Sequence, residues 1–246
     1  MEGILNVLKP PGMTSHDVAS FLRRTLGERR IGHSGTLDPQ AEGVLPVCIG
    51  RATRLAEYIG MENKSYFCEM TLGKATDTQD AWGKVISDQA IPPLDLAGIK
   101  DVAGNFLGKI KQKVPDYSAV KVAGQPLYKA ARRGDSLEPI YRFIEIYKLD
   151  ILDYQDQKIR FWVKCGKGTY VRALCQDLGE ALGTTGYMSF LVRTSVGSFT
   201  LADSYTLEEI AQHKEKLLMP MERGVAELPK ALLTDSQVRQ IFQGQS

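Results

Sequence analysis

The chain has 246 residues, 43% of them hydrophobic and 24% charged, and a net charge of +2. These values are ordinary for a soluble globular protein with one large domain, or one domain and an appendage. No apolar run approaches the roughly 20 residues that cross a bilayer, and the N-terminus lacks the features of a signal peptide. We therefore expect a cytoplasmic protein with no membrane partner.

The cysteines argue against a metal site. Cys48, Cys68, Cys165 and Cys175 are scattered, form no C-x-x-C pair and have no histidine close to the last two. The first three fall in strand-like runs, where a free cysteine behaves as a small buried hydrophobe. We expect no metal and no cofactor.

The first predicted elements are a strand and a helix. The short apolar run from Gly3 to Leu8 predicts a strand, which Pro10-Pro11-Gly12 would stop. Ser15 can then cap a helix whose apolar side chains recur at helical spacing and form one stripe: Val18, Phe21, Leu22 and Leu26.

A glycine-rich loop follows, with the sequence Gly32-His33-Ser34-Gly35-Thr36-Leu37-Asp38-Pro39-Gln40-Ala41-Glu42-Gly43. Glycine allows backbone conformations and close approaches that a side chain would block, so such a loop can admit a ligand. Pro39 would hold Asp38 in a defined direction. Asp38 can equally be the N-cap of a helix that begins at Pro39, which is the commoner role of an Asp-Pro pair. Local chemistry leaves both roles open.

The middle of the chain alternates between predicted strands and helices. Lys64 to Leu72 has period two and places Tyr66, Cys68, Met70 and Leu72 on one face, so Tyr66 could face a cleft beside the Asp38 loop. The other elements expected here are a buried strand at Val44 to Ile49, a helix at Ala52 to Ile59 ended by Gly60, a hairpin across Gly73 to Gly83, a helix at Leu94 to Phe106, and a helix at Pro126 to Arg133 ended by Gly134.

The C-terminal half continues the same alternation. We expect antiparallel strands at Arg142 to Leu152 and Ile159 to Cys165. A helix capped by Thr169 should run through Leu182 and be ended by Gly183. A strand at Met188 to Val196 and a helix at Thr206 to Gln212 should follow. Strands outnumber crossover units, and several adjoin through short turns. The fold class is therefore α+β, with one mixed, mainly antiparallel sheet flanked by helices.

Positive charge is concentrated in one segment. Between Lys109 and Arg133 there are seven basic residues and one acidic residue, Asp116, although the whole chain carries only +2. Tyr117 and Tyr128 lie among these charges. A basic, aromatic-bearing segment on a near-neutral protein suits a surface that follows RNA phosphates, and a solvated lysine-rich face is the alternative.

Five segments together resemble one family. Gly35-Thr36-Leu37-Asp38-Pro39, followed by Gly43-Val44-Leu45-Pro46, is similar to the catalytic loop of the bacterial TruB family of tRNA pseudouridine synthases. The other segments that resemble this family are Lys9-Pro10-Pro11-Gly12-Met13-Thr14-Ser15, Lys64-Ser65-Tyr66, Thr76-Asp77-Thr78-Gln79-Asp80 and Gly168-Thr169-Tyr170-Val171-Arg172. The resemblance implies a pseudouridine synthase fold, with a catalytic domain at residues 1–220 that includes a basic RNA-gripping insertion at about 109–135.

By this resemblance the protein would isomerise uridine to pseudouridine at the position conventionally numbered 55, in the T loop of tRNA. The nucleotide would be flipped out, its glycosidic bond broken and its base reattached through C5. Asp38 would be the essential carboxylate, Arg172 would pair with it, and Tyr66 would stack on the base and help to move the C5 proton. Whether Asp38 attacks C1′, adds to C6 or deprotonates C2′ stays open.

The same resemblance, with the basic segment, implies further contacts to substrate or RNA. These residues are His33, Lys64, Tyr170, Leu191, Lys109, Lys111, Lys113, Lys129, Arg132 and Arg133. Asp77 and Asp80 are candidate contacts to the RNA loop, and turn residues are the equal alternative. Other implied site residues also have a structural alternative: an exposed helix arginine for Arg172, a core tyrosine for Tyr66, a brace of the glycine loop for His33, a buttress of the site for Lys64, and ordinary core for Leu191.

Residues 221–246 are expected to form a linker and the partial start of an RNA-binding barrel of the PUA type, too short to close. The expected partner is the T stem-loop of tRNA, without an obligate protein partner, and the protein is expected to be a monomer. Two other functions stay open: a related synthase acting on another RNA, with or without guide-RNA partners, and a tRNA-binding or folding module with secondary catalysis. A metal-dependent hydrolase is unsupported, since no histidine ligands accompany Asp38 and Glu42.

Overall fold

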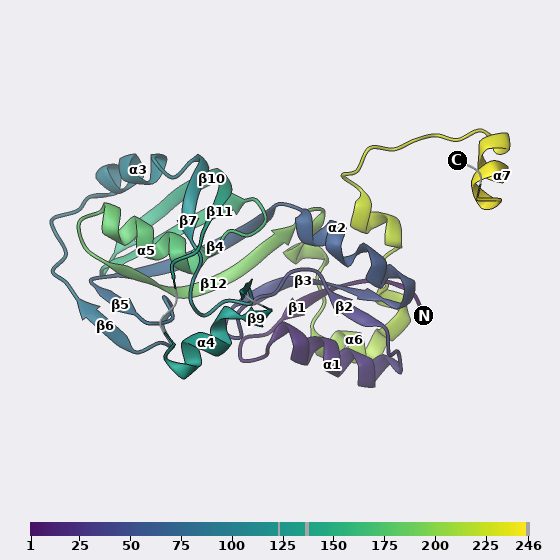
Figure 1. Ribbon diagram of the computed structural model, residues 1–246, viewed down its shortest axis with the longest axis horizontal. Helices are drawn as coiled ribbons and strands as arrows, with labels where there is room; N and C mark the ends of the chain where they lie inside the picture. The colour runs from purple at the N-terminus through teal and green to yellow at the C-terminus, as the bar shows by residue number, and fades with distance from the viewer. Residues whose placement is uncertain (123, 136–137, 245–246) are drawn as a thin grey trace.

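A nine-stranded sheet runs through the molecule (Figure 1). This computed structural model describes residues 1–122, 124–135 and 138–244. The strands of the sheet are β1 (Gly3–Lys9), β2 (Ile31–His33), β3 (Glu42–Ile49), β4 (Lys64–Leu72), β7 (Gly108–Lys113), β10 (Tyr141–Gln155), β11 (Lys158–Cys165), β12 (Gly186–Val196) and β13 (Phe199–Thr200). Their order is β1-β3-β12-β4-β11-β10-β7, with β2 paired to β3 and β13 paired to β12.

The sheet is mixed, because β12 runs parallel to β3 while the neighbouring pairs on either side of it run antiparallel. Two small ribbons pair β5 (Lys74–Thr76) with β6 (Val85–Asp88) and β8 (Lys121–Val122) with β9 (Gln125–Pro126). The α-helices are α1 (Ser15–Leu26), α2 (Ala56–Met61), α3 (Leu96–Gly104), α4 (Leu127–Arg133), α5 (Val171–Ala181), α6 (Leu207–His213) and α7 (Asp235–Phe242). Short 3₁₀ segments are η1 (Gly50–Leu55), η2 (Leu201–Asp203), η3 (Lys214–Leu217) and η4 (Met221–Val225). The expected α+β class with a mainly antiparallel sheet is confirmed.

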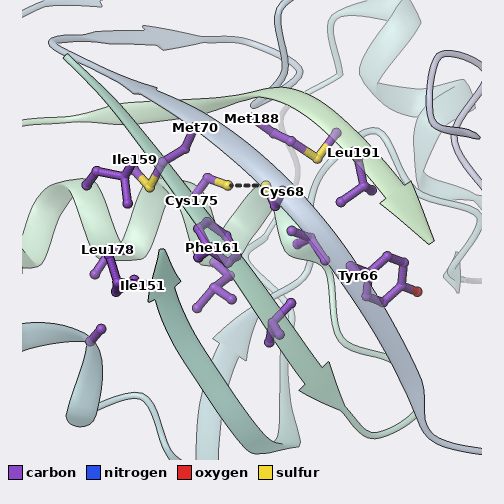
Figure 2. Packing of buried hydrophobic residues seen from close by; sticks show 14 of the residues in the cluster. Tyr66, Cys68, Met70, Ile151, Ile159, Phe161, Cys175, Leu178, Met188 and Leu191 are labelled. Atoms are coloured by element: carbon purple, nitrogen blue, oxygen red, sulfur yellow. Dashed lines mark hydrogen bonds between the residues drawn. The ribbon is translucent and has the colours of Figure 1, made fainter. Parts of the chain in front are cut away.

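The larger core lies between the sheet and helices α3 and α5. Strand β4 has the predicted bounds, and the predicted face, which carries Tyr66, Cys68 and Met70, is buried. Figure 2 shows Cys68 of β4 facing Cys175 of α5, with the two sulfur atoms 3.6 Å apart, and Tyr66 at the edge of the cluster. The four cysteines are free and buried.

A second core lies under the N-terminal strands. Helices α1 and α6 contribute Leu22 and Ile210, which pack with Val47 of β3. Because β3 pairs with β12, which in turn pairs with β4, the loop that leads into β3 lies where the two halves of the sheet meet.

Two predicted helix caps are wrong by one residue. Thr14, rather than Ser15, caps α1, because its hydroxyl accepts from the amide of Asp17 (3.0 Å) while Asp17 accepts from the amide of Thr14 (2.9 Å). Tyr170, rather than Thr169, occupies the cap position of α5. The hydroxyl of Thr169 instead donates to the backbone carbonyl of residue 166 (3.0 Å).

Other boundaries also differ from prediction; β10, for example, runs on to Gln155 rather than ending at Leu152. Residues 50–61 form η1 followed by α2, and Gly60 lies inside α2 rather than ending it. The hairpin expected at 73–83 extends to Asp88, since β6 begins only at Val85. Helix α4 does end at Gly134, which adopts the left-handed conformation that favours glycine.

The C-terminal tail separates from the body. Gly224 of η4 still packs against Ile4 and Ile59. Beyond it the chain runs out to α7, which lies apart from the body in Figure 1 and exposes Ile241 and Phe242. Within the described ranges, every helix is too short or too polar to cross a membrane.

Candidate active site

A cavity of about 560 Å³ opens beside the Asp38 loop. The predicted site residues that line it are Asp38, Lys64, Tyr66, Arg132, Tyr170, Arg172 and Leu191. They come from the loop between β2 and β3, from strands β4 and β12, from α4 and from the start of α5. Residues more than 150 positions apart in the sequence, such as Asp38 and Leu191, thus line one space.

Asp38 does not cap a helix. Residues 39–40 form a turn that leads into β3, so the helix-cap prediction is wrong. The reason is that the residues on either side of Asp38 are held from elsewhere. Ser15 bonds both backbone groups of Leu37, accepting from its amide (2.9 Å) and donating to its carbonyl (3.3 Å).

The other neighbour of Asp38 is held in the same way. The carbonyl of Pro39 accepts from Lys9 Nζ (2.9 Å) and from the backbone amide of Gly12 (2.9 Å). Lys9, Gly12 and Ser15 all belong to one N-terminal segment. That segment therefore fixes the backbone on both sides of Asp38 and leaves its side chain 35% exposed.

Arg172 pairs with Asp38 from the first turn of α5. Its Nε lies 2.8 Å from Asp38 Oδ2, and its Nη2 lies 3.4 Å from Oδ1. The remaining donors reach two backbone carbonyls, Thr78 (2.7 Å) and Tyr117 (3.0 Å). Arg172 is only 4% exposed, so it is not a solvated helix arginine. The fork geometry orients the carboxylate as well as neutralising it.

Tyr66 and Leu191 form the wall of the cavity that adjoins the core. Tyr66 is 7% exposed, and Leu191 is also buried. Burial raises the pKa of Tyr66 to about 12, although the nearby Arg193 lowers it. Both residues therefore belong to the core and to the cavity, and the two predicted roles do not exclude each other. The phenol stays protonated at neutral pH.

Lys64 turns its amine away from open solvent. Its Nζ donates to the backbone carbonyls of Gly60 (2.9 Å) and Glu62 (2.8 Å). Burial, and then the charge of Arg193, lower the pKa of Lys64 to about 8. These bonds make Lys64 a support of the connection between α2 and β4.

Other predicted contacts lie outside the cavity. His33 is partly buried in β2, where burial lowers its pKa, and its Nδ1 has no partner among the described residues. Lys109, Lys111 and Lys113 are exposed on β7, and the last two line a second cavity of about 510 Å³. These three lysines thus belong to the edge strand of the main sheet.

Lys121 lies exposed on β8, and helix α4 carries the rest of the basic segment. Lys129, Arg132 and Arg133 are exposed on it, and Arg132 alone of these three lines the cavity. Arg133 forms an ion pair with Asp135 at 2.7 Å. The basic residues of the segment thus lie on β7, β8 and α4.

The two aspartates between β5 and β6 make turn contacts. Asp80 accepts from the Thr78 hydroxyl (2.6 Å) and from the amide of Trp82 (3.1 Å). Asp77 accepts from the amide of Lys84 (2.8 Å). These bonds shape the turn that presents the Thr78 carbonyl to Arg172.

Two buried cations of the site went unassigned by sequence reasoning. Lys9 and Arg193 are both fully buried. The sequence signal for Arg193 was a charged residue directly after the apolar run Phe190-Leu191-Val192 of β12. Lys9 was visible in the N-terminal motif, but nothing in the sequence showed that its amine reaches Pro39.

The glycines of the loop act in two ways. A Cβ atom on Gly43 would lie 2.2 Å from the carbonyl oxygen of Arg193, so this glycine makes room for a neighbouring backbone rather than for a ligand. Gly35 has a φ of 83°, which favours glycine, and it lines the cavity. Within the described residues, no three His, Cys, Asp or Glu side chains are grouped to hold a metal.

Comparison with known proteins agrees with this geometry. A family model described as the TruB family pseudouridylate synthase N-terminal domain matches residues 23–171, and one described as the tRNA pseudouridylate synthase B C-terminal domain matches residues 172–226. A tRNA pseudouridine synthase B of Alkaliphilus oremlandii is 42% identical over 99% of this chain and 82% of its own length. The relative of the same name from Caldanaerobacter subterraneus is 44% identical over 100% of this chain and 86% of its own length.

Solved structures show the same fold. One chain of a Cbf5-Nop10-Gar1 complex is 30% identical to this protein with a TM-score of 0.79, over 99% of this chain and 68% of that one. A chain of an H/ACA ribonucleoprotein bound to a substrate RNA is 28% identical with a TM-score of 0.76, over 98% of this chain and 66% of that one. With a buried arginine paired to the loop aspartate, and with family matches over most of its length, the chain belongs to the TruB family of pseudouridylate synthases.

Proposed function

We propose that this protein isomerises uridine to pseudouridine in tRNA, with Asp38 as the essential carboxylate. The reaction breaks the C1′–N1 bond, forms a C1′–C5 bond and moves one proton from C5 to N1. It needs no oxidant, no metal and no energy source. The observation that carries the proposal is a partly exposed carboxylate held in a cavity by the buried guanidinium of Arg172.

The surroundings of Asp38 suit this chemistry. A carboxylate that adds to C1′ or C6, or that removes a proton from C2′, must be ionised and aimed. The fork from Arg172 supports both needs, and the bonds to Leu37 and Pro39 hold the backbone. Tyr66 stacks on the uracil while Leu191 closes the apolar side of the pocket, which fits their shared wall.

The target nucleotide enters the cavity after leaving its stack, because a stacked base shields its glycosidic bond. Unstacking costs a few kcal/mol and is easiest in an RNA loop. The substrate we propose is the T loop, with uridine 55 as the target. His33 would then touch a neighbouring base of the loop, since it lies outside the cavity that would hold the uridine.

The basic segment grips the RNA backbone in this proposal. Its side chains at Lys109, Lys111, Lys113, Lys129, Arg132 and Arg133 are exposed, as phosphate contacts require. Arg132 lies at the cavity and can follow the phosphate nearest the flipped nucleotide. Tyr170, at the start of α5, lines the cavity beside Arg172 and can contact the substrate.

We also propose that the catalytic unit ends after η4, near residue 225, five residues later than the sequence indicated, because Gly224 packs on Ile4 and Ile59. The tail beyond it would act as a linker to, or the start of, an accessory RNA-binding element. Since the substrate is tRNA, we place the reaction in the cytoplasm, carried out by a monomer without an obligate protein partner.

The test is an Asp38→Asn variant, assayed by tritium release from C5-labelled uridine in a T-stem-loop transcript. We expect turnover to fall by at least about 10³-fold, the size of effect seen when an essential nucleophile is removed. Binding of the transcript should be retained, because the amide keeps the size of the side chain. Asp88→Asn, an exposed aspartate on β6, is the matched control and should keep full activity.

Two outcomes would contradict the proposal. Product formed at the wild-type rate by Asp38→Asn would remove Asp38 from the chemistry. Release from an anticodon stem-loop at the same rate as from the T stem-loop would remove the T-loop preference.

The alternative substrate is another RNA selected with partner proteins, and its support is the likeness to chains from ribonucleoprotein complexes at 28–30% identity. The curated relatives at 42–45% identity are named for tRNA, which favours the substrate proposed above. Mapping pseudouridines in RNA from cells that lack the protein separates the two. Refolding of tRNA by Asp38→Asn would reveal a folding activity that is independent of catalysis.

A further inference from the structure

Arg193 is a buried cation to which the proposed reaction assigns no role. It lies in β12, is 0% exposed and lines the cavity with Asp38 and Tyr66. Within residues 1–122, 124–135 and 138–244, no carboxylate oxygen lies within 4.0 Å of its guanidinium. A buried charge without a counter-ion is unfavourable, so an apolar side chain would serve a purely structural role better.

The guanidinium is held by the two ends of the Asp38 loop. Its Nε donates to the carbonyl of Val44 (2.7 Å), and its Nη2 donates to the carbonyl of Gly35 (3.3 Å). Gly43 has a φ of 108° and allows the backbone of Arg193 to approach so closely that a Cβ would collide with it. The loop that carries Asp38 therefore also sets the position of Arg193.

A polar neighbour of Arg193 on the cavity side is Tyr66. The two residues are directly paired in the ladder between β12 and β4, and both line the cavity. The charge of Arg193 lowers the pKa of Tyr66, against the larger effect of burial. The guanidinium has more donors than its bonds to Val44 and Gly35 use, so it can also donate to the phenolic oxygen while the O–H of the phenol points elsewhere.

Figure 2 shows the direction of that oxygen. The ring of Tyr66 adjoins the core, and its hydroxyl points away from Cys68 and Cys175. The ring of Tyr66 is thus anchored by packing, and Arg193 lies directly across the ladder from it. The phenolic oxygen can accept from the guanidinium and still donate its own proton.

We propose that Arg193 is a positioning residue for Tyr66, holding its phenolic oxygen against the target base and balancing the negative charge that the oxygen gains during proton transfer. This inference rests on the proposed isomerisation. After C5 has bonded to C1′, one proton leaves C5 and one is added at N1. The phenolic oxygen gives its own proton to solvent and takes the proton from C5. Solvent returns one proton to N1, so the number of protons is unchanged over the reaction.

The test is a double-mutant cycle with Arg193→Met, Tyr66→Phe and the combined variant. Turnover and KM are measured with T-stem-loop transcripts that carry hydrogen or deuterium at C5. We expect Arg193→Met to lower kcat by about 10²-fold, the lower end of general acid–base effects, with KM changed less than about threefold and a larger C5 isotope effect. In the Tyr66→Phe background the same change should lower kcat by less than about threefold, because the oxygen it serves is gone.

Controls separate this role from folding. Arg23→Met is matched, because Arg23 also donates to a backbone carbonyl, Ile31 (2.8 Å), yet lies outside the cavity. It should leave kcat unchanged. If Arg193→Met fails to fold, the same cycle is run with Arg193→Lys, which keeps the charge but replaces the planar fork by a single ammonium group. This variant should retain more turnover than Arg193→Met.

Equal losses in both Tyr66 backgrounds would overturn the inference, as would an unchanged isotope effect or a change confined to KM. The failure of the proposed function looks different. If the wild-type protein makes no pseudouridine in any transcript, the proposed function fails. If it makes product and the cycle is additive, only the role of Arg193 fails.

Discussion

The side chain of Arg172 illustrates how much of the site depends on single hydrogen bonds. Its guanidinium joins Asp38 to the Thr78 turn and to the backbone at Tyr117. Three separate segments therefore meet at one buried group. Its planar fork suits this task, whereas an ammonium group presents a single point of charge.

We expect Arg172→Lys to lose most of its turnover, by about 10²-fold or more, while the fold is kept. Lysine preserves the charge but cannot bond both carboxylate oxygens and two carbonyls at once. Single-turnover rates and thermal unfolding are the measurements. Near-normal turnover would refute the importance of the pairing geometry.

At the scale of elements, most of the positive charge of the basic segment lies on the edge strand β7 and on the short helix α4. Strand β7 is tied to the start of α5, because the side chain of Gln112 accepts from the amide of Tyr170 (2.9 Å) and donates to its carbonyl (3.1 Å). Strand β7 thus exposes Lys111 and Lys113 and also holds the start of α5, the helix that carries Arg172. The strand proposed to contact RNA therefore also supports the geometry of the site.

Reversing charges on α4 tests its role in RNA binding. Lys129→Glu with Arg133→Glu should raise KM by about tenfold at low salt and flatten the dependence of affinity on salt, since each lost phosphate contact lowers the slope by about one. Lys100→Glu, an exposed lysine on α3, is the control. An unchanged salt slope would show that α4 does not touch phosphate.

At the scale of the whole molecule, buried clusters on the two sides of the sheet stabilise the fold, and the partly buried carboxylate of Asp177 opposes it. Burial and the nearby Glu180 raise the pKa of Asp177 on α5 to about 6. The folded state then holds this proton more tightly than the unfolded state does. Stability is therefore lost as pH rises from about 4 to about 6, and the full penalty remains at neutral pH.

Asp177→Asn should remove that penalty. We expect it to raise the free energy of unfolding at pH 7.5 by about 1–2 kcal/mol, after a discount for partial exposure, with no gain near pH 4. Thermal unfolding across this pH range is the measurement, and Asp101→Asn, an exposed aspartate on α3, is the control. A gain of the same size at every pH would mean that the carboxylate charge is not the cause.

Features that depend on neighbouring residues were open to prediction from the amino acids alone. Strand β4 was predicted with its observed bounds, since alternation of apolar residues is a local pattern. The burial of Cys68 followed from the same pattern. The cap of α1 was misplaced by one residue, because the Ser15 hydroxyl is taken by the backbone of Leu37 and Thr14 caps the helix instead.

Features that depend on distant residues were decided only by folding. Asp38 and Pro39 could equally begin a helix, until Lys9 and Ser15 bonded the backbone around them. Arg193 reaches the carbonyl of Gly35 across 158 positions of sequence, and no local pattern encodes that distance. Periodicity reports which face of an element is buried, but a site is made by which elements meet, and that depends on how the whole chain packs.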